Sequence, residues 1–344
     1  MTASPQLKLA VLFGGISEEH EVSLRSAAAV VEHLDPDRFE VVLQGIDRQG
    51  GWLDEEDSRR LFEGQTPLGS GGPPFLQDGV ECVFPVLHGP GGEDGTVQGW
   101  LELMEAPYVG SDCIGSAVAM DKSLAKHVLR SAGLPVVDWL DLAKVDFRNR
   151  RAEVLAEIAA WQPFPLFVKP ARLGSSVGIS RVMEAAQLGE ALDQAFEVDD
   201  HLLIEPALEV RELEIAVLDG PELLVSPPGE IRPKEWYDYS AKYLDDTAEL
   251  FVPAPNLAPR RVEMLQEMAA QAFRALRLGG MARVDFFLMA KDGRPYLNEI
   301  NTIPGFTSIS MYPKLMALTG LDFQALCSRL IDLALARQVV RVPG

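Results

Sequence analysis

The stretch from Ala282 to Met311 constrains the fold more than any other, because it has the pattern of two β-strands followed by a loop. Ala282–Met289 is apolar and rich in residues that favour strands, and Pro295–Asn301 is largely apolar again. Between them, Lys291-Asp292-Gly293 is typical turn sequence. The stretch is therefore predicted to form a β-hairpin.

Polar side chains interrupt the two strands of this hairpin at matching places. Arg283 and Asp285 lie two residues apart, as do Glu299 and Asn301, and side chains at this spacing share a face of the sheet. A three-residue loop with Gly293 in the left-handed conformation places Asp285 opposite Glu299 and Arg283 opposite Asn301. A two-residue Asp-Gly turn would instead separate the carboxylates onto opposite faces. We predict the first register.

In that register two carboxylates and an amide oxygen converge beside a guanidinium. Oxygen ligands of this kind bind Mg²⁺, especially where the ion also holds phosphates. The alternative is an ordinary solvated sheet face with a salt bridge, and we prefer the metal site. Its candidate ligands are Asp285, Glu299 and Asn301.

Composition limits the class of protein. A chain of 344 residues is long enough for two or three domains, and 47% hydrophobic with 24% charged residues is ordinary for a globular protein. The net charge of −20 argues against nucleic acid or an anionic membrane as a partner. There is no signal-peptide pattern and no long apolar run, and the three cysteines are scattered. We therefore expect a cytoplasmic protein without disulfides.

The first segment has the pattern of an open α/β layer. A buried strand at Leu7–Phe13 ends in two glycines, a helix capped by Ser17 follows over 18–33, and Phe39–Gly45 is the next strand. Ligands of such folds bind beyond the carboxyl ends of the strands, which places Glu19 near an expected site. A glutamate in this position is more often only a favourable charge at a helix N-terminus.

A glycine-rich loop at 88–95 follows the next predicted strand and begins with His88. Its glycines let the backbone approach a ligand closely, which would place His88 beside that ligand. A hydrogen-bonded structural histidine is the commoner case, and from the residues alone we favour it.

The central segment contains a second group of polar residues. A helix predicted over 116–132 contains Lys122, and two strands within 166–182 flank a loop with Gly174-Ser175-Ser176, preceded by Lys169. Unhindered backbone N–H groups, hydroxyls and a nearby ammonium suit phosphate oxygens. A flexible turn would explain the same loop.

The last third mixes strands with an unusual polar stretch. His201–Glu205 is predicted to be a strand ending in a carboxylate, and 235–243 is both polar and aromatic. Such a stretch is typical of a lid or binding loop, although a surface loop with packed aromatics is the plainer interpretation. Amphipathic helices are expected over 260–278 and 321–339.

In combination these segments resemble the ATP-grasp superfamily, in which ATP lies between two α+β domains, and within it the D-alanine–D-alanine ligase family. The matching sequences are LFGGISEEHEVSL (12–24), HGPGGEDGTVQGWLELMEAPYVGS (88–111), MDKSLAKHVLRSAGLPV (120–136), VKPARLGSSVGISRV (168–182), YDYSAKYL (237–244), and ARVDFFL with YLNEINTIPGFTSIS (282–310). The resemblance implies an α/β and α+β fold with three domains, an N-terminal open α/β domain at 1–119 and ATP-grasp subdomains at 120–208 and 209–344.

This resemblance implies that ATP drives the joining of two D-alanines through a D-alanyl phosphate, for peptidoglycan precursors. Asp285, Glu299 and Asn301 would ligate a pair of Mg²⁺ or Mn²⁺ ions. The residues that would contact ATP are Lys122, Lys169, Gly174, Ser175, Ser176, Val177, Glu205, Glu212 and Lys242.

The resemblance also implies contacts with the two amino acids. Glu19, linked through Ser175 to Tyr243, would bind the first D-alanine. The remaining implied residues are His88 at the first carboxylate, Arg283 and the N–H of Gly305 at the oxyanion, and Ser310 with Met311 at the second substrate.

Several alternatives stay open at this point. Tyr243 favours an amine acceptor over D-lactate, whereas Met311, where leucine is common in the family, leaves D-serine open as the acceptor. Another ATP-grasp ligase would keep the metal ligands without the set of Glu19, Ser175 and Tyr243. A non-catalytic nucleotide-binding protein would be expected to lose a metal ligand or Arg283. The family implies a homodimer.

Overall fold

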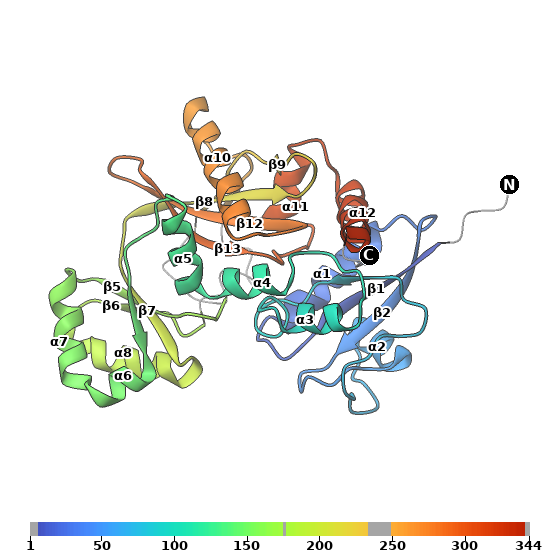
Figure 1. The fold of residues 1–344 in the computed structure, drawn as a ribbon, viewed down its shortest axis with the longest axis horizontal. Helices are drawn as coiled ribbons and strands as arrows, with labels where there is room; N and C mark the ends of the chain where they lie inside the picture. The colour runs from blue at the N-terminus through green and yellow to red at the C-terminus, as the bar shows by residue number, and fades with distance from the viewer. Residues whose placement is uncertain (1–5, 175–176, 233–248, 341–344) are drawn as a thin grey trace.

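The structure is a computed structural model that describes residues 6–174, 177–232 and 249–340, without the side chains of 338–340. Within these residues three β-sheets form the framework. Figure 1 shows the first sheet on the right in blue, the second on the left in green and yellow, and the third between them in orange. The domain boundaries inferred from the sequence stay a prediction. None of the helices in the described ranges is long and apolar enough to cross a membrane.

The first sheet is parallel, with the strand order β2-β1-β3. Its strands are β1 (Leu7–Gly14), β2 (Phe39–Ile46) and β3 (Cys82–Pro85), and its helices are α1 (His20–His33), α2 (Glu55–Phe62) and α3 (Thr96–Leu103). The side chains from Leu9 to Phe13 are fully buried, as expected for a central parallel strand covered on both faces. Helix α1 begins later than predicted, because Ser17 Oγ accepts from the N–H of Glu19 (3.1 Å) and does not cap the helix.

Two helices take the place of the single helix predicted over 116–132. They are α4 (Cys113–Met120) and α5 (Lys122–Ser131). Asp121 separates them, since its backbone is extended and its carboxylate accepts from the N–H groups of Ser123 and Leu124, each at 3.0 Å. Aspartate is among the strongest helix N-caps, so the chain starts a new helix here. The break makes Lys122 the first residue of α5.

The second sheet is antiparallel, with the order β4-β7-β5-β6. Its strands are β4 (Leu140–Ala143), β5 (Leu166–Pro170), β6 (Ser180–Val182) and β7 (His201–Pro206), and its helices are α6 (Lys144–Asn149), α7 (Arg151–Trp161) and α8 (Ala185–Val198). Phe147 of α6 and Phe196 of α8 stack in the core, with ring centroids 5.4 Å apart. The helices therefore shield one face of this sheet.

The third sheet has the order β11-β10-β8-β12-β13, with β9 added to β8. Its strands are β8 (Val210–Leu218), β9 (Leu224–Val225), β10 (Gly229–Arg232), β11 (Glu249–Phe251), β12 (Met281–Met289) and β13 (Pro295–Asn301), and its helices are α10 (Pro259–Ala275), α11 (Met311–Ala317) and α12 (Phe323–Val340). Alternate residues of β8 enter different cores: Ile215 and Val217 pack with α5 and α10, whereas Ala216 and Leu218 pack with α11 and α12. This alternation follows the pleat of the strand.

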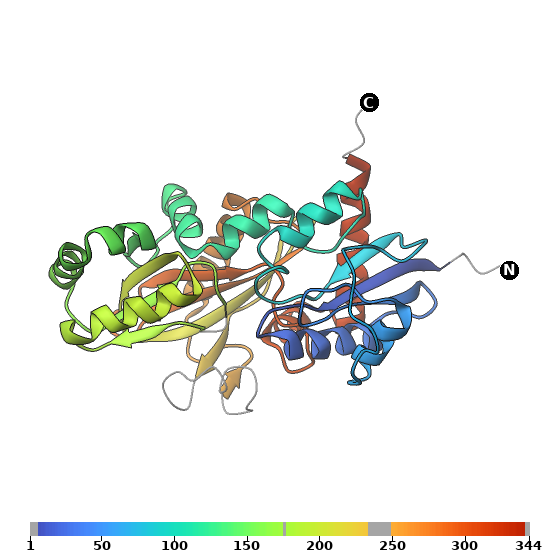
Figure 2. The ribbon, with the colours of Figure 1, turned by 90° about the horizontal axis from the view of Figure 1, so that it is seen from below.

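Helices α11 and α12 also complete the core of the first sheet. One cluster joins Phe13 and Phe84 of that sheet with Phe306 and Tyr312. The ring of Phe306 lies 5.8 Å from that of Phe84 and 5.9 Å from that of Tyr312, between centroids. Figure 2 shows α12 passing beside the first sheet. The first and third sheets are therefore packed against each other through shared apolar side chains.

Candidate active site

The hairpin of β12 and β13 brings the predicted metal ligands together. Asp285 pairs with Glu299, and Arg283 pairs with Asn301, so the predicted register is confirmed. The predicted three-residue loop is wrong, however, because Ala290–Gly293 close the hairpin. This longer turn is held by hydrogen bonds from the N–H of Met289 to the carbonyl of Arg294 and from the N–H of Gly293 to the carbonyl of Met289, each 2.9 Å. Gly293 does adopt the left-handed conformation, with φ +67°.

A β-bulge compensates for the longer turn. On the side of the bulge nearer the turn, Phe286 pairs with Leu297. One residue further from the turn, Asp285 pairs with Glu299, so Asn298 is the additional residue in the second strand. A bulge of this kind shifts the register by one residue. The carboxylates of Asp285 and Glu299 thus come from directly opposite positions of the two strands.

A third carboxylate, not among the predicted site residues, extends this pair into a row. Glu214 on β8 lies opposite Asp285 on the other side of β12, and the two residues are 3% and 7% exposed. Glu212, predicted to contact the nucleotide, lies two residues earlier on β8 and so on the same face. The sequence shows the alternation of Glu212 and Glu214 with apolar residues, but it does not show which of them lies beside Asp285.

The guanidinium of Arg283 partly neutralises this row. It donates from Nε and Nη2 to the two carboxylate oxygens of Asp285, at 2.8 and 2.7 Å, and its Nε lies 3.2 Å from Oε2 of Glu214. The side-chain amide of Asn301 donates to the same Asp285 at 3.1 Å. A bidentate contact fixes the plane of a guanidinium as well as its position. Arg283 is therefore held on the same sheet face as the predicted metal ligands.

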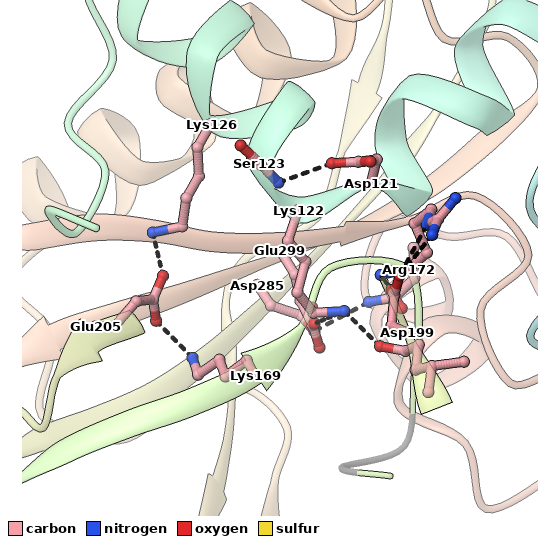
Figure 3. A network of polar contacts seen from close by, with 12 residues as sticks. Asp121, Lys122, Ser123, Lys126, Lys169, Arg172, Asp199, Glu205, Asp285 and Glu299 are labelled. Atoms are coloured by element: carbon pink, nitrogen blue, oxygen red, sulfur yellow. Dashed lines mark hydrogen bonds and ion pairs between the residues drawn. The ribbon is translucent and has the colours of Figure 1, made fainter. Parts of the chain in front are cut away.

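Lys122 connects the predicted phosphate loop to this row, as Figure 3 shows. Its backbone N–H donates to the carbonyl of Ala171 at 2.9 Å, and its Nζ donates to the carbonyl of Leu173 at 2.6 Å. The same Nζ lies 3.7 Å from Oε2 of Glu299. The first turn of α5, created by the break at Asp121, thus fixes the start of the loop beside the carboxylates.

Glu19 lies beside the same loop, from the first sheet. A Cβ placed on Gly174 would lie 3.5 Å from Oε2 of Glu19, and a Cβ placed on Gly89 would lie 2.9 Å from the same Glu19 oxygen. Gly89 also has φ +75°, so both its conformation and this close approach require glycine. The N–H of Val177 closes the loop by donating to the carbonyl of Gly174 at 3.1 Å. Four other predicted residues lie outside the described residues: Ser175, Ser176, Lys242 and Tyr243.

Glu205, near the end of β7, is a buried carboxylate between two lysines (Figure 3). Its Oε2 accepts from Nζ of Lys169 at 2.6 Å, and its Oε1 forms a short contact with Nζ of Lys126. Burial raises the pKa of Glu205, but the two ammonium groups outweigh burial and lower this pKa to about 2. Lys169 was predicted to belong to the site, whereas Lys126 was not, because nothing in its helical sequence distinguishes it from other lysines.

His88 joins the first sheet to the loop that follows β13. Its Nδ1 is 3.0 Å from the carbonyl oxygen of Ile303, and its Nε2 is 2.9 Å from Oγ of Ser26, which also accepts from the N–H of Phe306 at 3.3 Å. Burial lowers the pKa of His88, but the carboxylate of Glu93, 3.6 Å from Nδ1, raises it overall. These contacts match the structural role favoured from the residues alone.

The loop between β13 and α11 carries the residues predicted to meet the second substrate. Oγ of Ser310 accepts from the N–H of Thr307 at 3.1 Å and would lie 3.0 Å from a Cβ on Gly305. Met311 is buried, and its Sδ would lie 2.6 Å from a Cβ on Gly229. Gly305 and Ser310 are thus adjacent, while Met311 packs inward.

One face of the third sheet therefore gathers carboxylates, a fixed guanidinium and lysines from three parts of the chain. Oxygen ligands can hold a divalent ion, and lysines can hold phosphate oxygens beside it. Glu19 and His88 close the same region from the first sheet. The arrangement suits a reaction on a polyphosphate and a small polar substrate.

Comparison with known proteins identifies the family. Residues 8–111 match the family model described as D-ala D-ala ligase N-terminus, and residues 128–332 match the model described as D-ala D-ala ligase C-terminus. The D-alanine–D-alanine ligase of Heliobacterium modesticaldum is 45% identical over 347 residues, which cover 96% of this chain and 94% of that relative.

Solved structures give the same result. The D-alanine–D-alanine ligase from Coxiella burnetii superimposes with a TM-score of 0.84 at 37% identity, covering 98% of this chain and 96% of that one. The VanG D-Ala:D-Ser ligase from Enterococcus faecalis gives 0.82 at 35% identity, covering 96% of this chain and 100% of that one. Because these enzymes have the ATP-grasp fold, the predicted fold is confirmed. The chain belongs to the D-alanine–D-alanine ligase family of ATP-grasp enzymes.

Proposed function

We propose that this protein uses ATP to join two D-alanines through a D-alanyl phosphate, releasing ADP and supplying D-alanyl-D-alanine for peptidoglycan precursors. The observation that carries the proposal is the pairing of Asp285 with Glu299 beside Arg283 and Lys122, in a chain of this family. A free carboxylate is a poor acyl donor, and phosphorylation gives it a good leaving group that an amine can then displace.

In this proposal ATP lies between the second and third sheets. Lys122 and Lys169 hold its phosphates together with the loop at 174–177, while Glu205 and Glu212 contact the adenosine. The support is positional, since Lys122 is 3.7 Å from Glu299 and Lys169 is bound to Glu205. Lys242 is assigned to the γ-phosphate from the family resemblance alone.

The residues present fit Mg²⁺ or Mn²⁺. Asp285, Glu299 and Asn301 supply carboxylate and amide oxygens, which these hard ions prefer. In the described part of the chain no group of three His, Cys, Asp or Glu side chains is placed to hold a metal ion. This donor set suits ions that complete their coordination with nucleotide phosphates. A bound ion would neutralise charge on the transferring phosphoryl group.

The first D-alanine would lie between Glu19 and Arg283. Glu19 would bind the amino group, with Ser175 and Tyr243 assigned to the same site from the sequence alone, and His88 would lie near the carboxylate. Arg283 and the N–H of Gly305 would stabilise the oxyanion when the amine attacks, each contributing about 3 kcal/mol. The bidentate contact between Arg283 and Asp285 supports this role, because it fixes the guanidinium in advance.

The acceptor would bind at the loop before α11. The hydroxyl of Ser310, adjacent to Gly305, would receive its carboxylate, and Met311 would border its side chain. The acceptor amine would then face the acyl group held by Arg283.

The proposal can be tested by measuring phosphate release from ATP in the presence of Mg²⁺ with D-alanine, L-alanine, D-serine and D-lactate. The products are identified by mass. D-alanine alone is expected to support turnover, giving D-alanyl-D-alanine, and Arg283→Ala is expected to stop it. Faster turnover of D-alanine with D-serine or D-lactate would reassign the acceptor. If none of the D-amino acids supports phosphate release, the proposed ligation is rejected.

We also propose that the protein is a cytoplasmic homodimer. Leu103 at the end of α3, Met104 just after it, and Ile114 at the start of α4 are 85%, 52% and 64% exposed. The N–H of Cys113 donates to Glu102 at 3.1 Å, so the end of α3 and the start of α4 lie side by side, and we propose that their exposed apolar side chains contribute to the dimer interface. Sedimentation equilibrium should give a dimer for the wild type and a monomer for Leu103→Glu, and a monomeric wild type would reject the dimer.

The proposed location in the cytoplasm is supported by the free cysteines, which fit a reducing compartment, and by the proposed use of ATP.

A further inference from the structure

Lys126 is a buried lysine of this region to which neither the resemblance nor the proposed reaction gives a role. Its side chain is 3% exposed, and Nζ contacts Oε1 of Glu205 and donates to the carbonyl of Val137 at 2.9 Å. The ring of Trp139 lies 5.2 Å from the same Nζ. Burying an ammonium this deeply is costly unless it is paired, so the contact with Glu205 is what keeps it there.

Lys169 holds the other oxygen of Glu205 in a different setting. It comes from β5, its side chain is 12% exposed, and its Nζ is 2.6 Å from Oε2 of Glu205. The rings of Phe167 and Phe287 lie 5.7 and 5.8 Å from this Nζ. As Figure 3 shows, Lys126 and Lys169 approach Glu205 from opposite sides. In the proposed function, Lys169 must give its ammonium to a nucleotide phosphate.

We propose that Lys126 is a positioning residue, which stays with Glu205 and keeps that carboxylate charged and in place when Lys169 turns to a phosphate of ATP. This inference rests on the proposed function. With Lys126 present, the departure of Lys169 leaves a neutral buried pair. Without Lys126, the same movement leaves a buried carboxylate uncompensated, which is strongly unfavourable. Lys126 therefore frees Lys169 for the nucleotide without touching the nucleotide itself.

The surroundings of Glu205 make Lys126 the fixed partner. Charged groups reach this carboxylate from α5 through Lys126 and from β5 through Lys169. Arg130, one turn further along α5, acts on Lys126 electrostatically, and its guanidinium rests on Trp139 at 4.2 Å. Lys126 is thus enclosed by Arg130, the ring of Trp139 and the carbonyl of Val137, whereas Lys169 is the more exposed lysine and lies on β5, which leads into the proposed phosphate loop.

Binding of ATP, measured calorimetrically with Mg²⁺ and without D-alanine from pH 6 to pH 8, tests the proposal on the whole protein. Lys126→Met should raise the Kd of ATP at pH 8 by about tenfold or more, because Lys169 must now leave an unpaired carboxylate. The variant can avoid this cost by protonating Glu205 as ATP binds. The ratio of its Kd to that of the wild type should therefore fall as the pH is lowered from 8 to 6, by up to about tenfold per pH unit. Titration of ATP itself is common to both proteins and cancels in this ratio.

The double variant Lys126→Met/Glu205→Gln separates this role from a purely structural one. Without the carboxylate charge Lys126 has nothing to compensate, so the double variant should bind ATP within about threefold of Glu205→Gln alone. This comparison also decides the question if Lys126→Met alone does not fold. Lys144→Met, which removes a lysine paired with Asp200 (3.0 Å) outside this cluster, is the matched control and should bind like the wild type.

Two results would overturn the proposal. One is a Kd for Lys126→Met that equals the wild-type value, or that is raised by the same factor at every pH. The other is a further loss of affinity when Lys126→Met is added to Glu205→Gln. A wild-type protein that does not bind ATP would instead reject the proposed function.

Discussion

Asp285 and Glu299 face each other across β12 and β13 although the turn between these strands is one residue longer than their pairing requires. The bulge at Asn298 absorbs the difference, and strand twist increases at such a point. Glu214 then completes a row of three carboxylates across three strands, with Arg283 against two of them. The site is therefore built from regular sheet geometry with a single local irregularity.

Removing a member of the Asp285–Glu299 pair should stop the reaction. We expect Glu299→Ala to lower kcat at least about hundredfold, because the variant loses a proposed ligand of the metal ion that would neutralise the transferring phosphoryl group. Asp292→Ala, in the exposed turn of the same hairpin, is the matched control and should retain activity. Phosphate release with D-alanine measures both, and a Glu299→Ala enzyme within twofold of the wild type would contradict the assignment.

Glu214 should act through Arg283. Glu214→Gln keeps the shape of the side chain but removes the charge 3.2 Å from the arginine Nε, so the guanidinium is held less firmly. We expect kcat to fall about tenfold while the KM for ATP changes little, because the affected step is acyl transfer. Steady-state kinetics with varied ATP separates the two constants. A raised KM with unchanged kcat would assign Glu214 to nucleotide binding.

Asp121 should matter for stability as well as for the placement of Lys122. Asp121→Ala removes the cap of α5 and should lower the free energy of unfolding by about 1 kcal/mol, whereas Asp121→Asn keeps an oxygen acceptor and should lower it less. Urea denaturation measures this difference. Equal losses in the two variants would show that the carboxylate charge, rather than the cap, is responsible.

Glu205 should make stability depend on acid pH. Its folded pKa, about 2, lies below the ordinary value of 4.5, so its charge stabilises the protein above pH 4.5 and this contribution is lost as the pH falls toward 2. The free energy of unfolding of the wild type should exceed that of Glu205→Gln at pH 6, and the excess should shrink by about 2 kcal/mol between pH 6 and pH 3. Denaturant titrations between pH 6 and pH 3 follow the change, and an excess that does not vary with pH would contradict it.

The sequence predicted the β12–β13 hairpin and the pairing of its polar residues, because the alternation of polar and apolar residues is local information. It did not predict the length of the turn. The turn has one residue more than predicted, and the bulge at Asn298 shifts the register back by one, so Asp285 pairs with Glu299 as it would with the shorter turn. The break at Asp121 was missed because apolar periodicity continues through it, and only the cap geometry shows where α5 begins.

Glu214 and Lys126 show what local patterns leave out. Glu214 becomes part of the site only through the pairing of β8 with β12, which are distant in the sequence. Lys126 becomes distinctive only because α5 packs it against a carboxylate from β7. Both depend on tertiary register rather than on residue type, so neither has a signal in a single sequence.

The core that Phe13 and Phe84 share with Phe306 and Tyr312 also bears on how the chain is made. A ribosome releases the first sheet long before it releases α11 and α12, so part of the apolar surface of that sheet has no cover during most of translation. We expect the nascent chain to depend on chaperones until its last helices emerge. A chain truncated before α11, and therefore lacking α11 and α12, would then be degraded rather than accumulate as a stable fragment.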